Sequence, residues 1–158
     1  MDHAPKTYLL SRFVPELCRQ LAEYNRKLPP AERPQRQLRL RIVVHAGEIH
    51  WDGKGYFGEA LDLACRLLDA PGFKKALRSA SAPAALVVSD EIFWNIVKHG
   101  YDGLRADTFH PDVRVQMAGR RRQGWVHLPP DCLGSAGAYD GSRPYPPEMH
   151  AVANTTAA

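Results

Sequence analysis

The segment that most limits the possible folds of this chain is Gln37-Leu-Arg-Leu-Arg-Ile-Val-Val-His-Ala46. Its first half alternates polar and apolar residues, and most of its second half is continuously apolar. Alternation is typical of a strand with one covered face, whereas a short apolar run is typical of a strand covered on both faces. We therefore predict a β-strand here whose later part is buried on both faces.

The other periodic segments of the chain predict both helices and strands. In the helix predicted over about 58–69, the inner face is expected to comprise Leu61, Ala64, Cys65 and Leu68. The order of elements predicts an α+β fold in which helices pack on a largely antiparallel sheet. The first periodic segment covers about Lys6 to Leu28, and it predicts either one continuous helix kinked at Pro15 or, as favoured, a helix from about Val14 to Leu28 with Pro15 in its first turn. The other predicted elements are a hairpin around Asp52-Gly53, the helix over 58–69, a short helix over 73–79 after a stop at Pro71-Gly72, a buried strand over 84–89, a helix over 90–99 capped by Ser89, and a final antiparallel pair, 113–117 and 124–128, joined by an Arg-rich turn.

Composition places the chain among ordinary globular proteins. It has 158 residues, of which 44% are hydrophobic and 24% charged, with a formal net charge of +4. No apolar run approaches the length of a membrane span, and the three cysteines lack metal-ligand spacing, so we expect a cytoplasmic protein. The Gly-, Pro-, Ala- and Ser-rich stretch over 131–158 is predicted to be a disordered tail after one domain over 1–130.

Two charged residues near the start of the helix over 58–69 are candidates for function. Asp62 and Arg66 lie four residues apart, so they point the same way from the helix, about one turn separated. One interpretation is a surface ion pair that adds a few tenths of a kcal/mol. The other is one half of a site that handles phosphate groups.

Several motifs, taken in this order and at this spacing, resemble the C-terminal half of the catalytic domain of class III nucleotidyl cyclases. They are Arg41-Ile-Val-Val-His-Ala-Gly-Glu48, the hairpin after it, Gly58-Glu-Ala-Leu-Asp-Leu-Ala-Cys-Arg-Leu67 and Leu86-Val-Val-Ser89. The resemblance covers about residues 38–128 and implies a partial ferredoxin-like or cyclase-type sandwich. It also implies an ancestral reaction in which ATP or GTP becomes a cyclic 3′,5′-nucleotide and pyrophosphate.

The resemblance assigns roles to individual residues of this chain. Arg66 is similar to the arginine that stabilises the phosphate in the transition state, and Asp62 stands where the family has an asparagine that orients the ribose. Gln116 falls near the position of the phosphate-binding lysine, and the predicted turn Arg120-Arg121-Arg122 could supply the missing charge, with Arg120 as the residue chosen. Gly55 stands where the family carries the carboxylate that reads the base, so this contact is absent.

The metal-binding carboxylates of the family belong to its N-terminal half, which this chain lacks. Either a partner supplies that half, or the start of the coding sequence has been set too far downstream, or the chain is a degenerate relic. We therefore expect Mg²⁺ or Mn²⁺ to act only if a homodimer or a partner domain supplies those carboxylates, and we expect no activity from the chain alone. Without strands from that half, the central sheet would lose its middle, which predicts exposed apolar surface and association. The alternative function is a non-enzymatic nucleotide-binding, dimerisation or regulatory module.

Other candidate sites are less favoured. His45, at the end of the first predicted strand, is interpreted as a structural histidine with a hydrogen bond, and the remaining histidines share no metal-ligand spacing. The arginines of the strand and of the predicted turn are expected to form a solvated basic face, with phosphate binding as the alternative. We expect neither a membrane nor a nucleic acid as a partner, because no helix-turn-helix or RNA-binding aromatic strand is recognisable.

Overall fold

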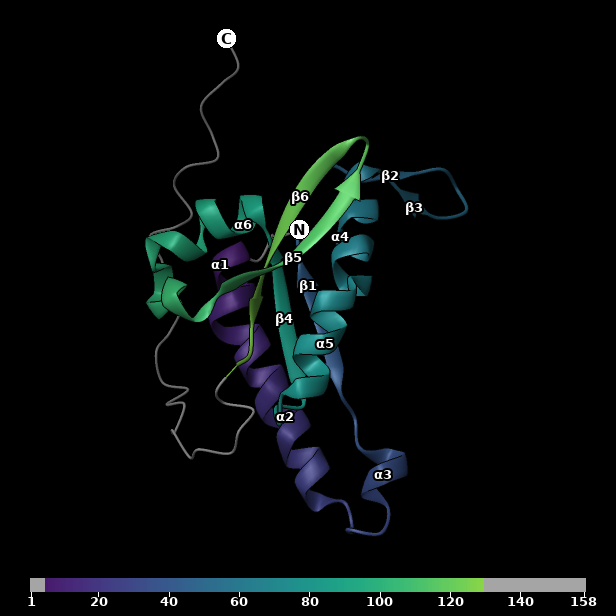
Figure 1. Cartoon of the computed structure of the whole chain (residues 1–158), viewed down its shortest axis with the longest axis vertical. Coiled ribbons are helices and arrows are strands. Elements are labelled where there is room, and N and C mark those ends of the chain that lie inside the picture. Colours follow the sequence, from purple (N-terminus) through teal and green to yellow (C-terminus); the bar gives the residue numbers. More distant parts are fainter. Residues whose placement is uncertain (1–4, 130–158) are drawn as a thin grey trace.

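A computed structural model describes residues 5–129, and these form helices packed on a sheet (Figure 1). This arrangement confirms the α+β fold predicted from the sequence. The predicted tail over 131–158 lies outside the described residues. In chain order the elements are α1 (Lys6–Tyr8), the π-helix η1 (Leu9–Phe13), α2 (Val14–Lys27), α3 (Arg33–Arg36), β1 (Leu40–Val44), β2 (His50–Trp51), β3 (Tyr56–Phe57), α4 (Glu59–Asp69), α5 (Pro71–Ser79), β4 (Ala84–Ser89), α6 (Asp90–Asn95), the 3₁₀ helices η2 (Val97–His99), η3 (Tyr101–Gly103) and η4 (Ala106–Thr108), β5 (His110–Met117) and β6 (Arg120–His127).

The main sheet has four strands in the order β1-β4-β6-β5. Strands β1 and β4 are parallel, with Ile42 opposite Leu86, because the chain between them crosses over through α4 and α5. The pairs β4–β6 and β6–β5 are antiparallel, so the prediction of a largely antiparallel sheet is confirmed. Strands β2 and β3 form a separate hairpin that projects from the body, as Figure 1 shows.

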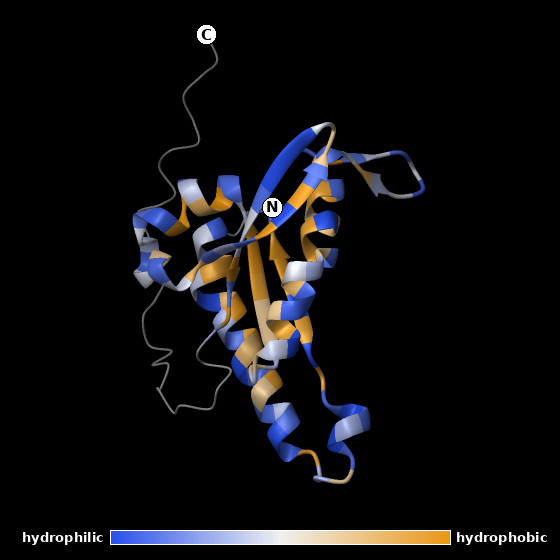
Figure 2. Ribbon diagram, in the orientation of Figure 1, coloured by the Kyte–Doolittle hydropathy of each residue, from blue (hydrophilic) through white to orange (hydrophobic). Residues whose placement is uncertain are grey.

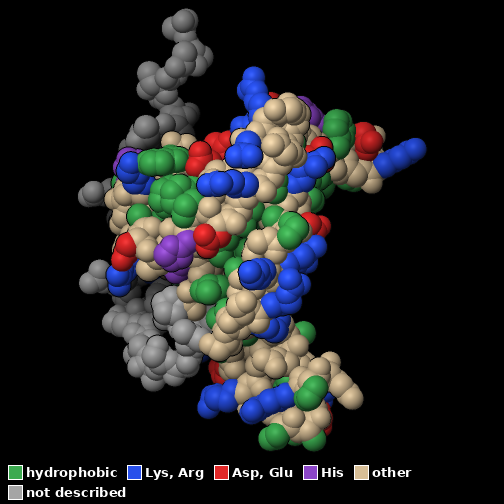
Figure 3. All heavy atoms as spheres, in the orientation of Figure 1, with side chains coloured by type: hydrophobic (Ala, Val, Ile, Leu, Met, Phe, Trp, Pro, Cys, Tyr) green, Lys and Arg blue, Asp and Glu red, His purple; other side chains and the backbone are tan. Residues whose placement is uncertain are grey.

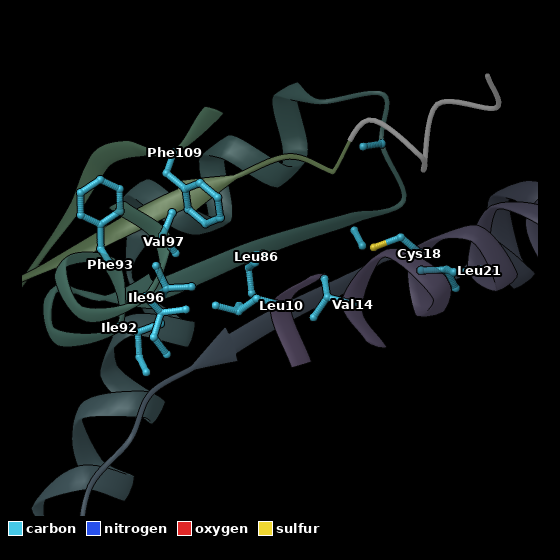
Figure 4. Close-up of a cluster of buried hydrophobic side chains, with 13 residues drawn as sticks. Leu10, Val14, Cys18, Leu21, Leu86, Ile92, Phe93, Ile96, Val97 and Phe109 are labelled. Carbon is cyan, nitrogen blue, oxygen red and sulfur yellow. The ribbon is translucent and has the colours of Figure 1, made fainter. Parts of the chain in front are cut away.

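Helices cover both faces of the sheet, and each face has its own apolar core. On one face, α4 and α5 pack against β4, β5 and β6; this core comprises Leu63, Leu67, Ala70, Phe73, Leu77, Ala85, Val87, Val113, Met117 and Val126. On the other face, η1, α2 and α6 pack against β4, as the close-up in Figure 4 shows. That second core comprises Leu10, Val14, Cys18, Leu21, Ala82, Ala84, Leu86, Val88, Ile92, Phe93, Ile96, Val97 and Phe109.

The burial of the two parallel strands differs, and here the sequence prediction was wrong. Every residue of β4 is buried, whereas every residue of β1 is half-buried. The physical reason is strand order, since β4 has a neighbour on each side and β1 lies at the edge of the sheet. Each strand in the described sheet is hydrogen-bonded to the next, so the prediction that the sheet would lose its middle is wrong. The described sheet instead ends at β1 on one side. Figure 2 shows both strands as strongly apolar.

Helical backbone at the N-terminus of the described residues begins at Lys6, which matches the alternative of one continuous helix and not the favoured start at Val14. Helix α2 begins at Val14 with Pro15 in its first turn, as the sequence indicated, but helical backbone continues upstream through η1 and α1. A proline inside a helix lacks the amide that would bond to the carbonyl of the preceding turn. The π-helix directly before Pro15 is a widened turn of the kind that accommodates such a break.

Helix α4 buries a different face from the one predicted. Leu63 and Leu67 are buried in the core, while Leu61 and Cys65 are exposed. The prediction that Cys65 belongs to the core is therefore wrong. Apolar residues surround most of this helix, and the packing of α4 on the sheet selects which of them are covered. The predicted stop before Pro71 is confirmed, since α4 ends at Asp69 and Ala70 is extended, but the next helix, α5, begins at Pro71 and not at Phe73.

The arginines expected in the last turn are part of a strand. The turn of the β5–β6 hairpin is Ala118-Gly119, where both residues have positive φ, 47° and 73°. A two-residue turn with positive φ at both positions matches the twist of the flanking strands, so Arg120 already pairs with Met117 in the ladder. The predicted Arg-rich turn is therefore wrong, and Arg122 lies in β6.

Candidate functional site: the exposed face of helix α4

Two features of the local sequence orient helix α4. It begins after Gly58, which has a φ of 141°, and a Cβ there would lie 3.1 Å from a backbone oxygen of the preceding segment. Glycine therefore allows the chain to turn sharply from β3 into the helix. Leu63 and Leu67 then anchor the inner face on the sheet, and Asp62 and Arg66, each one residue earlier, are exposed.

Asp62 and Arg66 share the exposed face of α4 but do not form the surface ion pair that their spacing allows. Within residues 5–129, neither side chain makes a hydrogen bond or an ion pair. A guanidinium without a protein partner presents donors in a planar fork that matches phosphate oxygens. A carboxylate accepts hydrogen bonds, including those of ribose hydroxyls. This face therefore has both groups available for a ligand or a partner.

The N-terminal end of α4 meets a network of charged groups that the sequence did not predict, although Arg122 was among the arginines considered for phosphate binding. Arg122 of β6 lies 3.3 Å from the Glu59 carboxylate and 3.6 Å from the Glu91 carboxylate at the start of α6. Its Nε atom is buried and has no partner among the described residues. This network joins α4, α6 and the end of the sheet, so it fixes how α4 presents its outer face. Register between distant strands creates the network, and no local motif signals it.

His45 has the structural role that the sequence predicted. Its Nδ1 atom lies 2.8 Å from the Ser89 Oγ, and this hydroxyl also accepts a hydrogen bond from the Ile92 amide at the start of α6. Burial lowers the pKa of His45, while the Glu91 carboxylate 3.9 Å away acts in the opposite direction. The contact ties the end of β1 to the cap of α6.

The structure does not bring Gln116 and Arg120 together with Asp62 and Arg66. Met117 of β5 is buried on the face that α4 covers, and its neighbour Gln116 points to the opposite face, because side chains alternate along a strand. Arg120 pairs directly with Met117 and so leaves the sheet on the α4 side, where it is exposed. None of the described contacts joins either residue to the outer face of α4.

The described residues do not fit the metal that the resemblance implies. Within residues 5–129, no group of three or more His, Cys, Asp or Glu side chains is placed to hold a metal ion. The carboxylates of Glu59, at the start of α4, and of Glu91, at the start of α6, already flank Arg122. A cavity of about 260 Å³ lies elsewhere, between the N-terminal helix and the segment around Phe109, and neither Asp62 nor Arg66 lines it.

Basic side chains are numerous on the surface of the molecule. Figure 3 shows Lys and Arg side chains along several elements of one face, with acidic side chains among them. Many of these charges are paired within exposed helices, as Arg19 is with Glu16 at 2.7 Å. The surface in this view is therefore mixed in charge. The solvated basic face predicted for the arginines of the first strand is wrong, because Arg39 and Arg41 donate hydrogen bonds to backbone carbonyls at the ends of α5 and α4.

Comparisons of the chain with protein-family models, with curated proteins and with solved structures give no match. No helix within residues 5–129 is both long enough and apolar enough to cross a membrane.

Proposed function

We propose that this chain is the C-terminal part of a nucleotidyl cyclase-like domain and contacts a nucleoside triphosphate through the outer face of α4. The observation that supports this is the exposed pair Asp62 and Arg66, which share one helix face, have no partner among the described residues and follow directly after the β2–β3 hairpin. The ancestral reaction is the conversion of ATP or GTP to a cyclic 3′,5′-nucleotide and pyrophosphate.

Each residue of the pair has a role that its chemistry allows. Cyclisation builds negative charge on the phosphoryl oxygens, and a guanidinium held there favours the transition state over the bound substrate. Arg66 is exposed and has no ion-pair partner within residues 5–129, so its charge is available for this purpose. Asp62, one helical turn earlier, would accept hydrogen bonds from the ribose hydroxyls. Its negative charge also weakens triphosphate binding, so we expect low affinity.

We further propose that the chain needs a partner to act as an enzyme, since the described residues do not fit Mg²⁺ or Mn²⁺. A second copy or a separate domain would supply the carboxylates. We place the chain in the cytoplasm, because Cys65 is an exposed free thiol on α4 and a reducing compartment preserves such a group.

The second candidate is a non-enzymatic module that binds a nucleotide and regulates a partner. It is favoured by the network at the start of α4, where Arg122 engages Glu59 and Glu91 and leaves neither carboxylate available for a metal. The pair Asp62 and Arg66 would then hold a nucleotide without transforming it.

One experiment separates these functions. The purified full chain is mixed with ATP or GTP and Mn²⁺, and both the cyclic product and the midpoint of thermal unfolding are measured. Arg66→Ala tests the site, and Arg78→Ala on the neighbouring helix α5 is a matched control, because it removes the same charge from another exposed position.

The enzyme is supported by cyclic product that disappears in Arg66→Ala and remains in Arg78→Ala. The binding module is supported by thermal stabilisation without product, again lost only in Arg66→Ala. Saturating nucleotide at a hundred times its Kd stabilises the folded state by about 2.7 kcal/mol, which such a scan detects. Equal behaviour of the two variants, or no response to either nucleotide, contradicts the proposal.

A further inference from the structure

The outer edge of β1 has backbone groups that no described residue satisfies. The Leu40 amide donates to the Pro83 carbonyl oxygen at 2.8 Å, in register with β4. Alternate residues of a strand direct their amide and carbonyl groups the same way, so Leu40, Ile42 and Val44 bond to β4. Arg41 and Val43 therefore direct theirs outward, to the side where the described sheet has no further strand.

This edge lacks the features that usually protect an exposed strand. Natural edges carry proline, a β-bulge or charged side chains that prevent pairing with another chain. The sequence of β1 is Leu-Arg-Ile-Val-Val, without proline and in regular register with β4. Its one charged residue, Arg41, reaches back to the Leu68 carbonyl at 2.6 Å and to Asp69 at 3.2 Å. That guanidinium therefore binds the end of α4 and does not guard the edge.

The arginine that precedes β1 is engaged in a similar way. The Arg39 guanidinium donates to the carbonyl oxygens of Ala80 at 2.7 Å and Ala82 at 3.1 Å, after the end of α5. Both positive charges near the edge are thus held by the C-terminal ends of helices, where they complement unpaired carbonyls. What remains along the edge is apolar, and Leu38 just before it leaves 48% of its surface exposed.

We propose that β1 pairs with β1 of a second copy of this chain, antiparallel about a two-fold axis at Ile42, so that the two four-stranded sheets become one. An edge that meets itself about a two-fold axis must run antiparallel, and such a contact closes as a dimer. The proposal is independent of the nucleotide chemistry proposed above, since it rests on the backbone of β1 alone.

The alternation of the backbone groups fits this register. When the pairing is centred on Ile42, Arg41 lies opposite the partner's Val43. Arg41 and Val43 are the residues whose amides and carbonyls point outward. Each such pair exchanges two hydrogen bonds, and symmetry makes two pairs, with the two copies of Ile42 as the non-hydrogen-bonded pair between them. A register shifted by one residue would bring an outward residue opposite an inward one and lose these bonds.

The side chains also permit the pairing. Leu40 falls opposite the partner's Val44, and Arg41 opposite an apolar valine, so like charges do not face each other within the strand. Arg39 falls opposite the partner's His45, whose pKa is lowered by burial, so this histidine is uncharged near neutral pH. Like charges directly opposite would destabilise a strand pair, and this register avoids them.

A disulfide cross-link tests both the dimer and its register. Ile42→Cys places two thiols across the axis, where Cβ atoms of a directly opposite pair lie about 4.5–5.5 Å apart. Leu40→Cys is the matched control on the same face of β1, because its two copies would be about 13 Å apart at 3.3 Å per residue, beyond the reach of a disulfide. Both are made in the full chain with Cys65→Ser and Cys132→Ser, while Cys18 is buried.

We expect oxidised Ile42→Cys to run as a covalent dimer and Leu40→Cys to stay monomeric. Sedimentation of the parent chain over a dilution series should show a reversible dimer. Val43→Pro removes an outward amide and should sediment as a monomer with its cooperative thermal unfolding retained. If Val43→Pro fails to fold, the pair of cysteine variants still decides the question.

A parent chain that remains monomeric at every concentration overturns the proposal. That result is expected if the edge of β1 pairs with a strand of another protein instead. Equal cross-linking of both cysteine variants, or cross-linking of Leu40→Cys alone, overturns it as well. No nucleotide enters this experiment, so its failure leaves the proposed function untouched.

Discussion

Gly124 of β6 is the residue on which the placement of α4 depends most directly. A Cβ at this position would lie 2.8 Å from Leu67 Cδ2, 3.0 Å from Val87 Cγ2 and 3.2 Å from Val113 Cβ. Leu67 and Val87 have no exposed surface and Val113 has 1%, so none of the three can move aside into solvent. The substitution Gly124→Ala therefore forces a methyl group into the core beneath α4.

Two opposing effects decide the magnitude of the change. Overpacking of a closely packed core costs about 1–3 kcal/mol. Replacing glycine by alanine also restricts the unfolded chain, which stabilises the folded state by about 0.4–1 kcal/mol where the backbone allows it. Gly124 lies in a regular strand without positive φ, so this second effect applies in full. Taken at the midpoints of the two ranges, the net loss in the free energy of unfolding is about 1.3 kcal/mol.

Urea unfolding followed by circular dichroism measures this loss directly, and the midpoint of thermal unfolding should fall by about 3–8 °C. Gly55→Ala is the matched control, because a Cβ there meets nothing within 4 Å and its φ is not positive. We expect Gly55→Ala to be neutral or slightly stabilising. A Gly124→Ala variant as stable as the parent chain would refute the close contact between α4 and β6.

Two further predictions concern polar groups outside α4. Burial lowers the pKa of His45 from its ordinary value of 6.5, so just below that pH the unfolded chain binds more protons than the folded one. The free energy of unfolding should therefore be highest above about pH 6.5 and fall as the pH drops towards the folded pKa of His45. In urea unfolding at several pH values, His45→Asn should reduce the dependence of this free energy on pH. An unchanged pH dependence would exclude His45 as its source. Arg39→Met removes the hydrogen bonds to the carbonyls after α5 and should cost about 1 kcal/mol in the same assay. Arg105→Met is the control, because it removes only an ion pair to Asp107 between two largely exposed side chains, and it should cost less than about 0.5 kcal/mol. If Arg39→Met and Arg105→Met lower the free energy of unfolding equally, the capping role of Arg39 is contradicted.

Signals confined to a few neighbouring residues predicted their structures correctly. Ser89 caps α6 as expected, the turn at Asp52-Gly53 joins β2 and β3, and Gly100 ends the helical segment with a φ of 69°. Each of these depends on the local conformational preference of one or two residues. For the same reason, the sequence was sufficient to place Asp62 and Arg66 on one face of one helix.

What lies next to each residue was decided by the tertiary structure. Apolar residues surround most of α4, so the sequence of the helix alone does not determine whether Cys65 or Leu67 is buried. The space that Gly124 leaves on the sheet favours the burial of Leu67. The apolar run of β1 suits a central strand equally well, and strand pairing across long stretches of chain put it at the edge. The turn at Ala118-Gly119 likewise set the register that turns Gln116 away from α4. Local sequence determines which conformation a segment prefers, whereas its neighbours follow from the packing of the whole chain, because burial and register are properties of pairs of distant residues.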